Sequence, residues 1–268
     1  MIVDFHSHTS NSDGSLSTSE LVTAMERRGV SIFSITDHDT TRAYGELPAM
    51  QAQIVTGIEI NTSDDGRDVH ILGFGFDPGP DTPLAGTMRN NQAARRVRVE
   101  KMLAQLQRAG YPVTNEMVAA EAVGSESLGR PHVAKALVRA GLVRDVETVF
   151  RQLLTRGCVG YVPSHHITPP EAIEAIARSG GVAVLAHPGR LREDAIIDAL
   201  AEQGLIGLEV FYPTHTSSQT AYFREKAARC GLVMTAGSDF HDARWNASVV
   251  GIDVDPDDIR DFLELVAT

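Results

Sequence analysis

The stretch VSIFSITDHD, residues 30–39, joins a run of β-branched and apolar residues to a cluster of acidic and imidazole side chains. The run Val30–Thr36 is typical of a buried strand. Asp37, His38 and Asp39 follow it directly, and the carboxyl ends of strands are where β/α barrels carry their functional side chains. The stretch therefore predicts a barrel strand with a functional site at its end.

The same alternation of strands and helices continues along the chain. Expected strands are Met1–Phe5, Ile54–Ile60, Val69–Phe76, Gly181–Ala186, Leu205–Val210 and Val233–Ala236, and expected helices are Ser17–Arg28, Pro169–Ser179, Glu193–Gln203 and Ser217–Arg229. Such alternation favours a parallel sheet with helices outside, and a (β/α) barrel is its natural closure over 268 residues. Ser17 and Glu20 form a capping-box pattern at the start of the first helix.

One region interrupts this rhythm. From about residue 77 to 160 the pattern is helical, with expected helices at Gly86–Ala109, Asn115–Val123, His132–Ala140 and Val146–Arg156. We therefore predict three parts: the first part of a barrel at 1–83, a helical insertion at 84–156, and the second part of the barrel at 157–268. The long helix carries Arg89, Arg95, Arg96, Arg98 and Lys101, which fits a solvated face as well as a functional one.

Composition limits the function classes. Apolar residues make up 43%, and the formal net charge is −11, the wrong sign for a protein that coats duplex DNA. A small anionic substrate fits if metal ions supply positive charge. The chain has no apolar run of the roughly 18 residues that a membrane helix needs, and its N-terminus lacks a signal-peptide pattern. Cys158 and Cys230 have no metal or disulfide spacing, so we expect a reducing, cytoplasmic location.

Imidazole and carboxylate side chains recur at successive expected strand ends. His6 and His8 point the same way in an extended segment and can reach one ion. Each signal has an ordinary alternative: His6 and His8 as a surface pair, His70 as a satisfied core histidine. Joint burial of so many ionisable groups without a partner would cost several kcal/mol each, so the pattern indicates divalent metals. The candidate ligands are His6, His8, Asp13, His38, Glu59, His70, His187, Asp239 and His241.

These motifs, in this order, resemble the PHP (polymerase and histidinol phosphatase) superfamily of metal-dependent phosphoesterases. The resemblance implies an α/β fold, a distorted, TIM-like (β/α)7 barrel, with a trinuclear centre at the carboxyl ends of the strands. It implies one ion held by His6, His8, Glu59 and Asp239. A second would be shared through Glu59 with His70 and His187, and a third held by Asp13, His38 and His241. Asp37 is expected to orient a ligand histidine.

Two further segments resemble the subgroup that contains 3',5'-nucleoside bisphosphate phosphatases and a 5'-to-3' exoribonuclease. They are Gly129-Arg130-Pro131-His132 and the segment Glu209–His215. The resemblance implies that the insertion caps the site and that Arg130 and His132 contact a substrate phosphate. It places His215 in the phosphate pocket or the outer metal shell. His165 and His166 match no motif and are expected to be loop histidines.

The sequence thus predicts a phosphoesterase that uses two or three divalent ions and a metal-bound hydroxide. Mn²⁺ is favoured, and Zn²⁺, Fe²⁺ or Mg²⁺ also suit the ligands. The expected partner is a small phosphorylated substrate, a 3',5'-bisphosphate nucleotide or a short RNA end, and neither duplex DNA nor a membrane. The sequence does not indicate an oligomeric state. The alternatives are a histidinol-phosphate-type phosphatase, an amidohydrolase-type hydrolase and an inactive metal-binding module.

Overall fold

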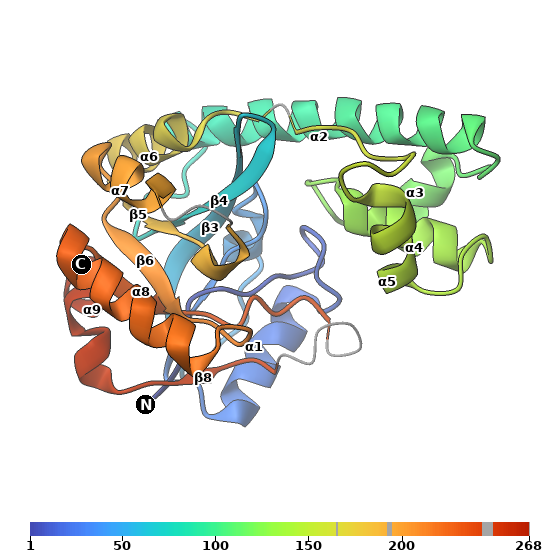
Figure 1. The fold of residues 1–268 in the computed structure, drawn as a ribbon. Helices are drawn as coiled ribbons and strands as arrows, with labels where there is room; N and C mark the ends of the chain where they lie inside the picture. Colours follow the sequence, from blue (N-terminus) through green and yellow to red (C-terminus); the bar gives the residue numbers. More distant parts are fainter. Residues whose placement is uncertain (165, 192–194, 243–248, 268) are drawn as a thin grey trace.

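A barrel-like sheet forms the centre of the molecule (Figure 1). The computed structural model describes residues 1–164, 166–191, 195–242 and 249–267. Over these residues the strand order is β7-β6-β5-β4-β3-β2-β1-β8. The strands are β1 (Ile2–Asp4), β2 (Ile32–Ile35), β3 (Gln53–Asp64), β4 (Arg67–Phe74), β5 (Val182–Leu185), β6 (Gly207–Phe211), β7 (Val233–Ala236) and β8 (Ile252–Asp253).

The chain just after β1 closes the barrel against β7. The Phe5 amide donates to the Ala236 carbonyl at 2.9 Å, and Ser7 pairs with Phe240 in a parallel bridge. β8 lies antiparallel to the start of β1, beside this seam. The predicted α/β barrel is therefore confirmed.

The direction of one strand differs from the expectation. β4 runs antiparallel to both β3 and β5, whereas strand–helix–strand alternation predicted a parallel sheet. The cause is a tight hairpin in which Asp65 and Gly66 both have positive φ, 47° and 73°. Asp-Gly is among the preferred pairs for a two-residue hairpin turn of this kind, so the sequence held a signal that strand periodicity alone does not reveal.

Helices cover the outside of the barrel (Figure 1). They are α1 (Thr18–Arg28), α6 (Pro169–Arg178), α7 (Ala195–Glu202) and α8 (Ser217–Cys230), with 3-10 turns at Arg42–Gly45, Pro188–Arg190 and Pro256–Asp258. α9 (Arg260–Val266) instead packs on the apolar cluster that contains Phe5 and Phe74. The predicted capping box is present, because Ser17 and Glu20 each accept from the other's backbone amide. The predicted start of α7 at Glu193 lies outside the described residues. β8 and α9 were not predicted.

The helices between β4 and α6 are α2 (Pro83–Arg108), α3 (Asn115–Glu121), α4 (Arg130–Arg139) and α5 (Val146–Val149), with a π-helical turn at Phe150–Leu154, and together they are called the insertion below. α2 runs along the barrel and continues beyond it to carry α3, α4 and α5 (Figure 1). Its first turns place Leu84 and Met88 in the barrel core, and its later turns place Val99 and Leu106 in a second apolar core. The predicted single helix at 146–156 is instead a short α-helix followed by the wider turn.

Two further features concern the cysteines and the length and polarity of the helices. Cys158 and Cys230 are both free thiols. Among the described residues, none of the helices combines the length and apolar character needed to cross a bilayer.

Candidate metal centre

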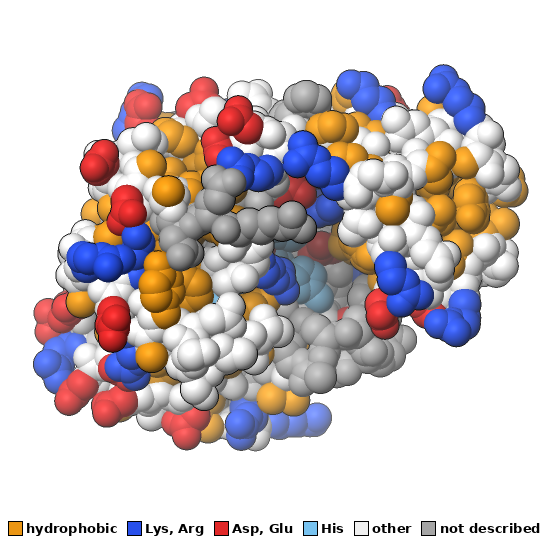
Figure 2. All heavy atoms as spheres, in the orientation of Figure 1, with side chains coloured by type: hydrophobic (Ala, Val, Ile, Leu, Met, Phe, Trp, Pro, Cys, Tyr) orange, Lys and Arg blue, Asp and Glu red, His pale blue; other side chains and the backbone are white. Residues whose placement is uncertain are grey.

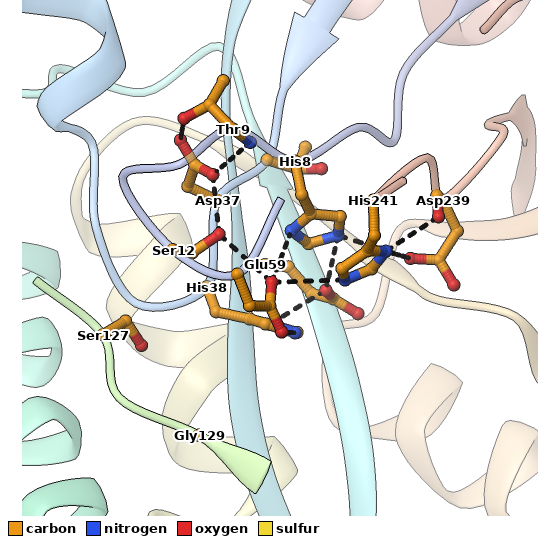
Figure 3. A network of polar contacts seen from close by, with 12 residues as sticks. His8, Thr9, Ser12, Asp37, His38, Glu59, Ser127, Gly129, Asp239 and His241 are labelled. Carbon is orange, nitrogen blue, oxygen red and sulfur yellow. Dashed lines mark hydrogen bonds and ion pairs between the residues drawn. The ribbon is translucent and has the colours of Figure 1, made fainter. Parts of the chain in front are cut away.

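The structure brings the predicted ligand residues together at one end of the barrel. Figure 3 shows five of them, His8, His38, Glu59, Asp239 and His241. His6 and His8 follow β1, and His38 follows β2. His187 follows β5, and Asp239 and His241 follow β7. Glu59 and His70 lie within β3 and β4, whose long hairpin carries them to the same place. Asp13 comes from the loop between β1 and α1.

One group of ligand atoms is formed by His6, His8, Glu59 and Asp239. Nε2 of His6 and of His8 lie 3.3 and 3.2 Å from Oε2 of Glu59, and 3.4 and 3.3 Å from Oδ1 of Asp239. Two imidazoles and two carboxylates facing one point match a site for Zn, Mn or Fe ions. This is the grouping that the resemblance implied.

The other groupings differ in detail from the expectation. His8 joins Asp13, His38 and His241, and His38 joins Glu59 and His70; the ligand atoms within each group lie within 4.8 Å of one another. His187 lies beside the second of these, with Nε2 at 3.2 Å from Glu59 Oε1. Glu59 therefore stands between two neighbouring positions, and its two oxygens face different histidines.

The buried imidazoles and carboxylates shift one another's pKa. Burial alone would raise the pKa of Glu59, but the charges of His38 and His70 hold the pKa well below its usual range. Burial alone would lower the pKa of His8, but the close carboxylates of Asp239 and Glu59 raise that pKa to about 10. The carboxylates thus stay ionised in a buried site, which is the state that ligates a cation.

Several buried polar atoms of the candidate ligands lack a hydrogen-bond partner, as expected for side chains that bind a metal. Nε2 of His6, both ring nitrogens of His8, Oε2 of Glu59 and Nδ1 of His187 are buried and have no hydrogen-bond partner. Leaving a buried polar atom unpaired costs about 1–3 kcal/mol. Most of these orphaned atoms face the clustered ligand positions, so the residues fit a group of divalent ions.

Glu209 in β6 holds His6 from behind, and sequence reasoning missed it. Its Oε1 lies 2.9 Å from Nδ1 of His6, and its Oε2 accepts the backbone N–H of His187 at 2.7 Å. This arrangement keeps the proton of His6 on Nδ1 and leaves Nε2 available to a cation. In the sequence it is a lone carboxylate inside the apolar strand LEVF and the first residue of the segment Glu209–His215, with no indication of its contact with His6.

Asp37 has a different partner from the one expected. It accepts the Thr9 backbone N–H at 2.7 Å and the hydroxyls of Thr9 and Ser12 at 2.6 and 2.7 Å (Figure 3). These bonds engage both carboxylate oxygens. Asp37 therefore fixes the loop between His8 and Asp13 rather than orienting an imidazole.

Tyr212 and Arg190 fix the far oxygen of Asp239. The Tyr212 hydroxyl donates to Oδ2 at 2.9 Å, and the Arg190 guanidinium lies 3.1 Å from the same atom. Arg190 also lies over the Tyr212 ring, 5.2 Å from its centroid. Oδ1 of Asp239 is thereby turned toward His6 and His8. Tyr212 lies in the segment Glu209–His215 noted in the sequence, but no motif indicated a contact of Tyr212 or Arg190 with Asp239.

Arginines converge above the cluster. A cavity of about 150 Å³ is lined by seven of the nine candidate ligands and by Arg95, Arg98, Arg130 and Arg190. Arg130 lies 3.0 Å from Asp68, and Arg98 lies 3.9 Å from the same carboxylate. Arg95 donates to the buried Asp39 at 2.7 Å. Three of these arginines come from the insertion, which therefore contributes the positive side of the cavity.

His132 has a structural position. It is 1% exposed, and its Nδ1 accepts the backbone N–H of Gly129 at 3.1 Å, which caps α4 and places Arg130 at the start of that helix. Burial lowers the pKa of His132 to about 4. It is absent from the described lining of the cavity, so the geometry gives it a positioning role instead of the expected phosphate contact.

His215 likewise acts through its neighbours. Its Nδ1 lies 2.9 Å from the Val210 carbonyl, and its Nε2 accepts the Gly189 backbone N–H at 3.2 Å. A Cβ at Gly189 would lie 2.7 Å from the His215 ring, so this close approach requires glycine. The contact holds the turn between His187 and Arg190. His166 is half-buried near Arg95 and Asp39, and His165 lies outside the described residues.

A closed α/β barrel with a buried cluster of imidazoles and carboxylates at its strand ends defines a class, the metal-dependent barrel hydrolases. The particular family follows from comparison with known proteins. The chain belongs to the PHP domain family, whose model matches residues 4–147.

Several relatives are similar over nearly the whole chain. A 3',5'-nucleoside bisphosphate phosphatase from Chromobacterium violaceum is 34% identical, covering 89% of this chain and 87% of its own. A phosphoribosyl 1,2-cyclic phosphate 1,2-diphosphodiesterase from Eggerthella lenta is 34% identical, covering 90% and 94%. The 5'-3' exoribonuclease Rnm of Escherichia coli is 33% identical, covering 90% and 85%.

Solved structures agree with the fold. A chain from Bifidobacterium adolescentis described as a metal-dependent phosphoesterase has a TM-score of 0.86 and 32% identity, covering 98% of this chain and 96% of its own. A chain from Chromobacterium violaceum described as an amidohydrolase has a TM-score of 0.87 and 31% identity, covering 99% and 96%. Family, relatives and site together make this protein a metal-dependent phosphoesterase, as predicted.

Proposed function

We propose that the protein hydrolyses a phosphate ester of a nucleotide-like substrate, with a 3',5'-bisphosphate nucleotide or a short RNA end as the physiological choice. The observation that carries this proposal is the pairing of the ligand cluster with the arginine cavity. The cluster supplies places for cations, and Arg95, Arg98 and Arg130 face the same small space. Two of the named relatives act on such substrates.

We assign His6, His8, Asp13, His38, Glu59, His70, His187, Asp239 and His241 as the metal ligands. Bound divalent ions would lower the pKa of water and neutralise phosphate oxygens. We propose Mn²⁺ as the bound ion, and the mixed imidazole and carboxylate set also accepts Zn²⁺, Fe²⁺ and Mg²⁺. Arg130, at the first position of α4, can grip a phosphate with two parallel N–H bonds because its guanidinium is planar and permanently charged.

The remaining residues hold these groups in place. Glu209 fixes His6, Tyr212 and Arg190 fix Asp239, and Asp37 fixes the loop that carries Asp13. Hydrolysis forms a P–O bond from water and breaks the P–O bond to the leaving group, whose oxygen takes up a proton. Asp68 neutralises Arg98 and Arg130 until a phosphate replaces it.

The test is phosphate release from adenosine 3',5'-bisphosphate, and nucleotide release from a 5'-phosphorylated oligoribonucleotide, in the presence of Mn²⁺. We expect at least one of these activities, with loss by a factor of 10² or more in Glu59→Gln and in Arg130→Ala. Glu264→Gln and Arg229→Ala, on the outer helices α9 and α8, are the matched controls. Full metal loading with no release from either substrate would reject the proposal.

The amidohydrolase alternative is weaker on the same geometry. That class commonly needs a carboxylated lysine between its metals, and here Glu59 stands between two groups of ligands. Lys226 pairs with Asp198 on the outer helices, away from the cluster. A panel of cyclic amides assayed beside the nucleotides separates the two classes, and histidinol phosphate in the same panel tests the remaining phosphatase alternative.

A further inference from the structure

Two spaces of very different size meet at the ligand cluster. The arginine cavity measures about 150 Å³, and a groove of about 1,030 Å³ opens between α4, α5 and the loop that follows β1. Both are lined by Asp13, Pro131, Phe150, Arg190, Asp239 and His241. Figure 2 shows the molecule hollowed between barrel and insertion, with histidine side chains on the floor of the hollow.

Volume decides what each space can hold. Pockets for ligands of drug size measure roughly 300–1,000 Å³. The arginine cavity is below that range, so it suits a phosphate group and excludes a nucleoside. The groove lies at the top of the range. A substrate whose phosphate lies over the cluster must therefore place its nucleoside in the groove.

Phe150 stands where the two spaces join. It begins the π-helical turn at Phe150–Leu154, a widened geometry that is frequent at functional sites. The residue packs on the apolar core of the insertion, beside Val149 and Leu153, and still lines both spaces. An aromatic ring at this position offers a stacking surface, and every nucleobase has a face that can stack on it.

The walls of the groove carry cations in exposed ion pairs. Arg139 lies 2.7 Å from Glu121, with 70% of its side chain exposed, and Arg144 lies 2.5 Å from Asp145, with 82% exposed. Exposed pairs of this kind contribute about 0–1 kcal/mol, so a phosphate can compete for these arginines. The groove therefore tolerates an anionic nucleotide as well as a neutral base.

We propose that this groove is the nucleoside site and that Phe150 stacks on the base of the leaving group. The inference rests on the proposed function and places the nucleoside, the part of the substrate that the metal ligands and arginines do not contact. Because stacking carries no hydrogen-bond code, the site accepts all four bases. Hydrolysis then releases a nucleoside or nucleotide alcohol into the groove, with its new hydroxyl proton, while the phosphate stays by the arginines.

The experiment compares adenosine 3',5'-bisphosphate with 1-deoxyribose 3,5-bisphosphate, which has the same phosphates and no base. We expect the wild type to favour the first in kcat/KM by roughly 5- to 150-fold, the usual range for one stacked base. Phe150→Leu should bring this ratio close to one, and Phe150→Tyr, which keeps the ring, should retain it. Binding of 2-aminopurine riboside 3',5'-bisphosphate should quench its fluorescence in the wild type and not in Phe150→Leu.

Each outcome bears on one of the two proposals. A ratio near one in the wild type, or an undiminished ratio and quenching in Phe150→Leu, overturns the nucleoside site. Lower stability of a variant would reduce activity on both substrates by the same factor, so instability alone cannot bring the ratio to one. If metal-loaded wild type hydrolyses neither compound nor the oligoribonucleotide, the proposed function itself fails.

Discussion

Glu209 determines how His6 faces the candidate metal positions. Its carboxylate accepts hydrogen bonds from Nδ1–H of His6 and from the backbone N–H of His187, so one side chain positions candidate ligands from two strand ends. Outer-shell carboxylates of this kind raise the basicity of the imidazole and fix its tautomer. Residues such as Glu209, which lie outside the ligand motifs, are therefore needed to orient the ligands.

Replacing Glu209 tests this role. Glu209→Gln keeps the size of the side chain and removes its charge, so we expect Mn²⁺ affinity to fall about 10- to 100-fold. Titration calorimetry on the metal-free protein measures the change, with the exposed Glu202→Gln in α7 as the control. Equal affinities in the wild type and Glu209→Gln would show that His6 does not need this partner.

His132 predicts a pH effect on stability. Burial lowers its pKa from 6.5 to about 4, so the folded protein resists protonation that the unfolded chain accepts. Neutral His132 makes its full contribution to the free energy of unfolding above pH 6.5, and this contribution is lost as the pH falls toward 4. Between pH 7 and 5 the loss is about 2 kcal/mol.

Urea unfolding of the metal-free protein at both pH values provides the measurement. Wild type should lose about 2 kcal/mol more than His132→Gln over this interval, because the variant has no imidazole to titrate. The comparison cancels the other histidines, which the two proteins share. Parallel pH dependence in the two proteins would mean that His132 titrates normally.

At the scale of elements, α9 covers the end of the barrel opposite the site. Phe262 is fully buried, and its ring centroid lies 4.8 Å from that of Phe5 and 5.2 Å from that of Phe74. Phe262→Ala should therefore cost about 3–5 kcal/mol in the free energy of unfolding. Leu265→Ala, at a residue that is 46% exposed on the same helix, should cost about 0.5 kcal/mol or less. Denaturant unfolding distinguishes the two, and similar losses would contradict this packing.

The β3–β4 hairpin places His70 against Glu59, 2.7 Å from Nδ1 to Oε1. Its turn depends on Gly66, whose φ of 73° disfavours a side chain although nothing fills the space beside it. Gly66→Ala should cost about 1–2 kcal/mol, the penalty for a left-handed L-residue. Gly45→Ala, also in open space and without a positive φ, is the control. If thermal unfolding shifts equally in both variants, the turn imposes no such requirement.

These elements show what the sequence could reveal. Buried strands such as residues 30–36 were predictable, because a short apolar and β-branched run followed directly by polar ligand residues is typical of a barrel strand. The reversal of β4 was not inferred, because periodicity reports burial and leaves strand direction open, and only Asp65-Gly66 carried that information. α9 was missed because DFLELV is too short for a clear helical period. Glu209 and Tyr212 were missed because their roles depend on partners distant in sequence.

At the scale of the whole molecule, the insertion and barrel share one site. Buried Asp39 follows His38 and accepts Arg95 and Asn91 from α2, and Thr40 donates to Glu126 at 2.6 Å. The insertion is thereby tied to the loop beside the ligands. A protein with a net charge of −11 still gathers arginines above its acidic cluster, because their counterions Asp39 and Asp68 lie in the same place.

The most direct test of the central claim is anomalous diffraction at the manganese edge from crystals grown with Mn²⁺. We expect two or three peaks, within about 2.0–2.3 Å of side-chain nitrogen and oxygen atoms of His6, His8, Asp13, His38, Glu59, His70, His187, Asp239 and His241. We also expect Glu59 to contact more than one of the ions. No peak at saturating Mn²⁺, or peaks only elsewhere on the molecule, would contradict the claim.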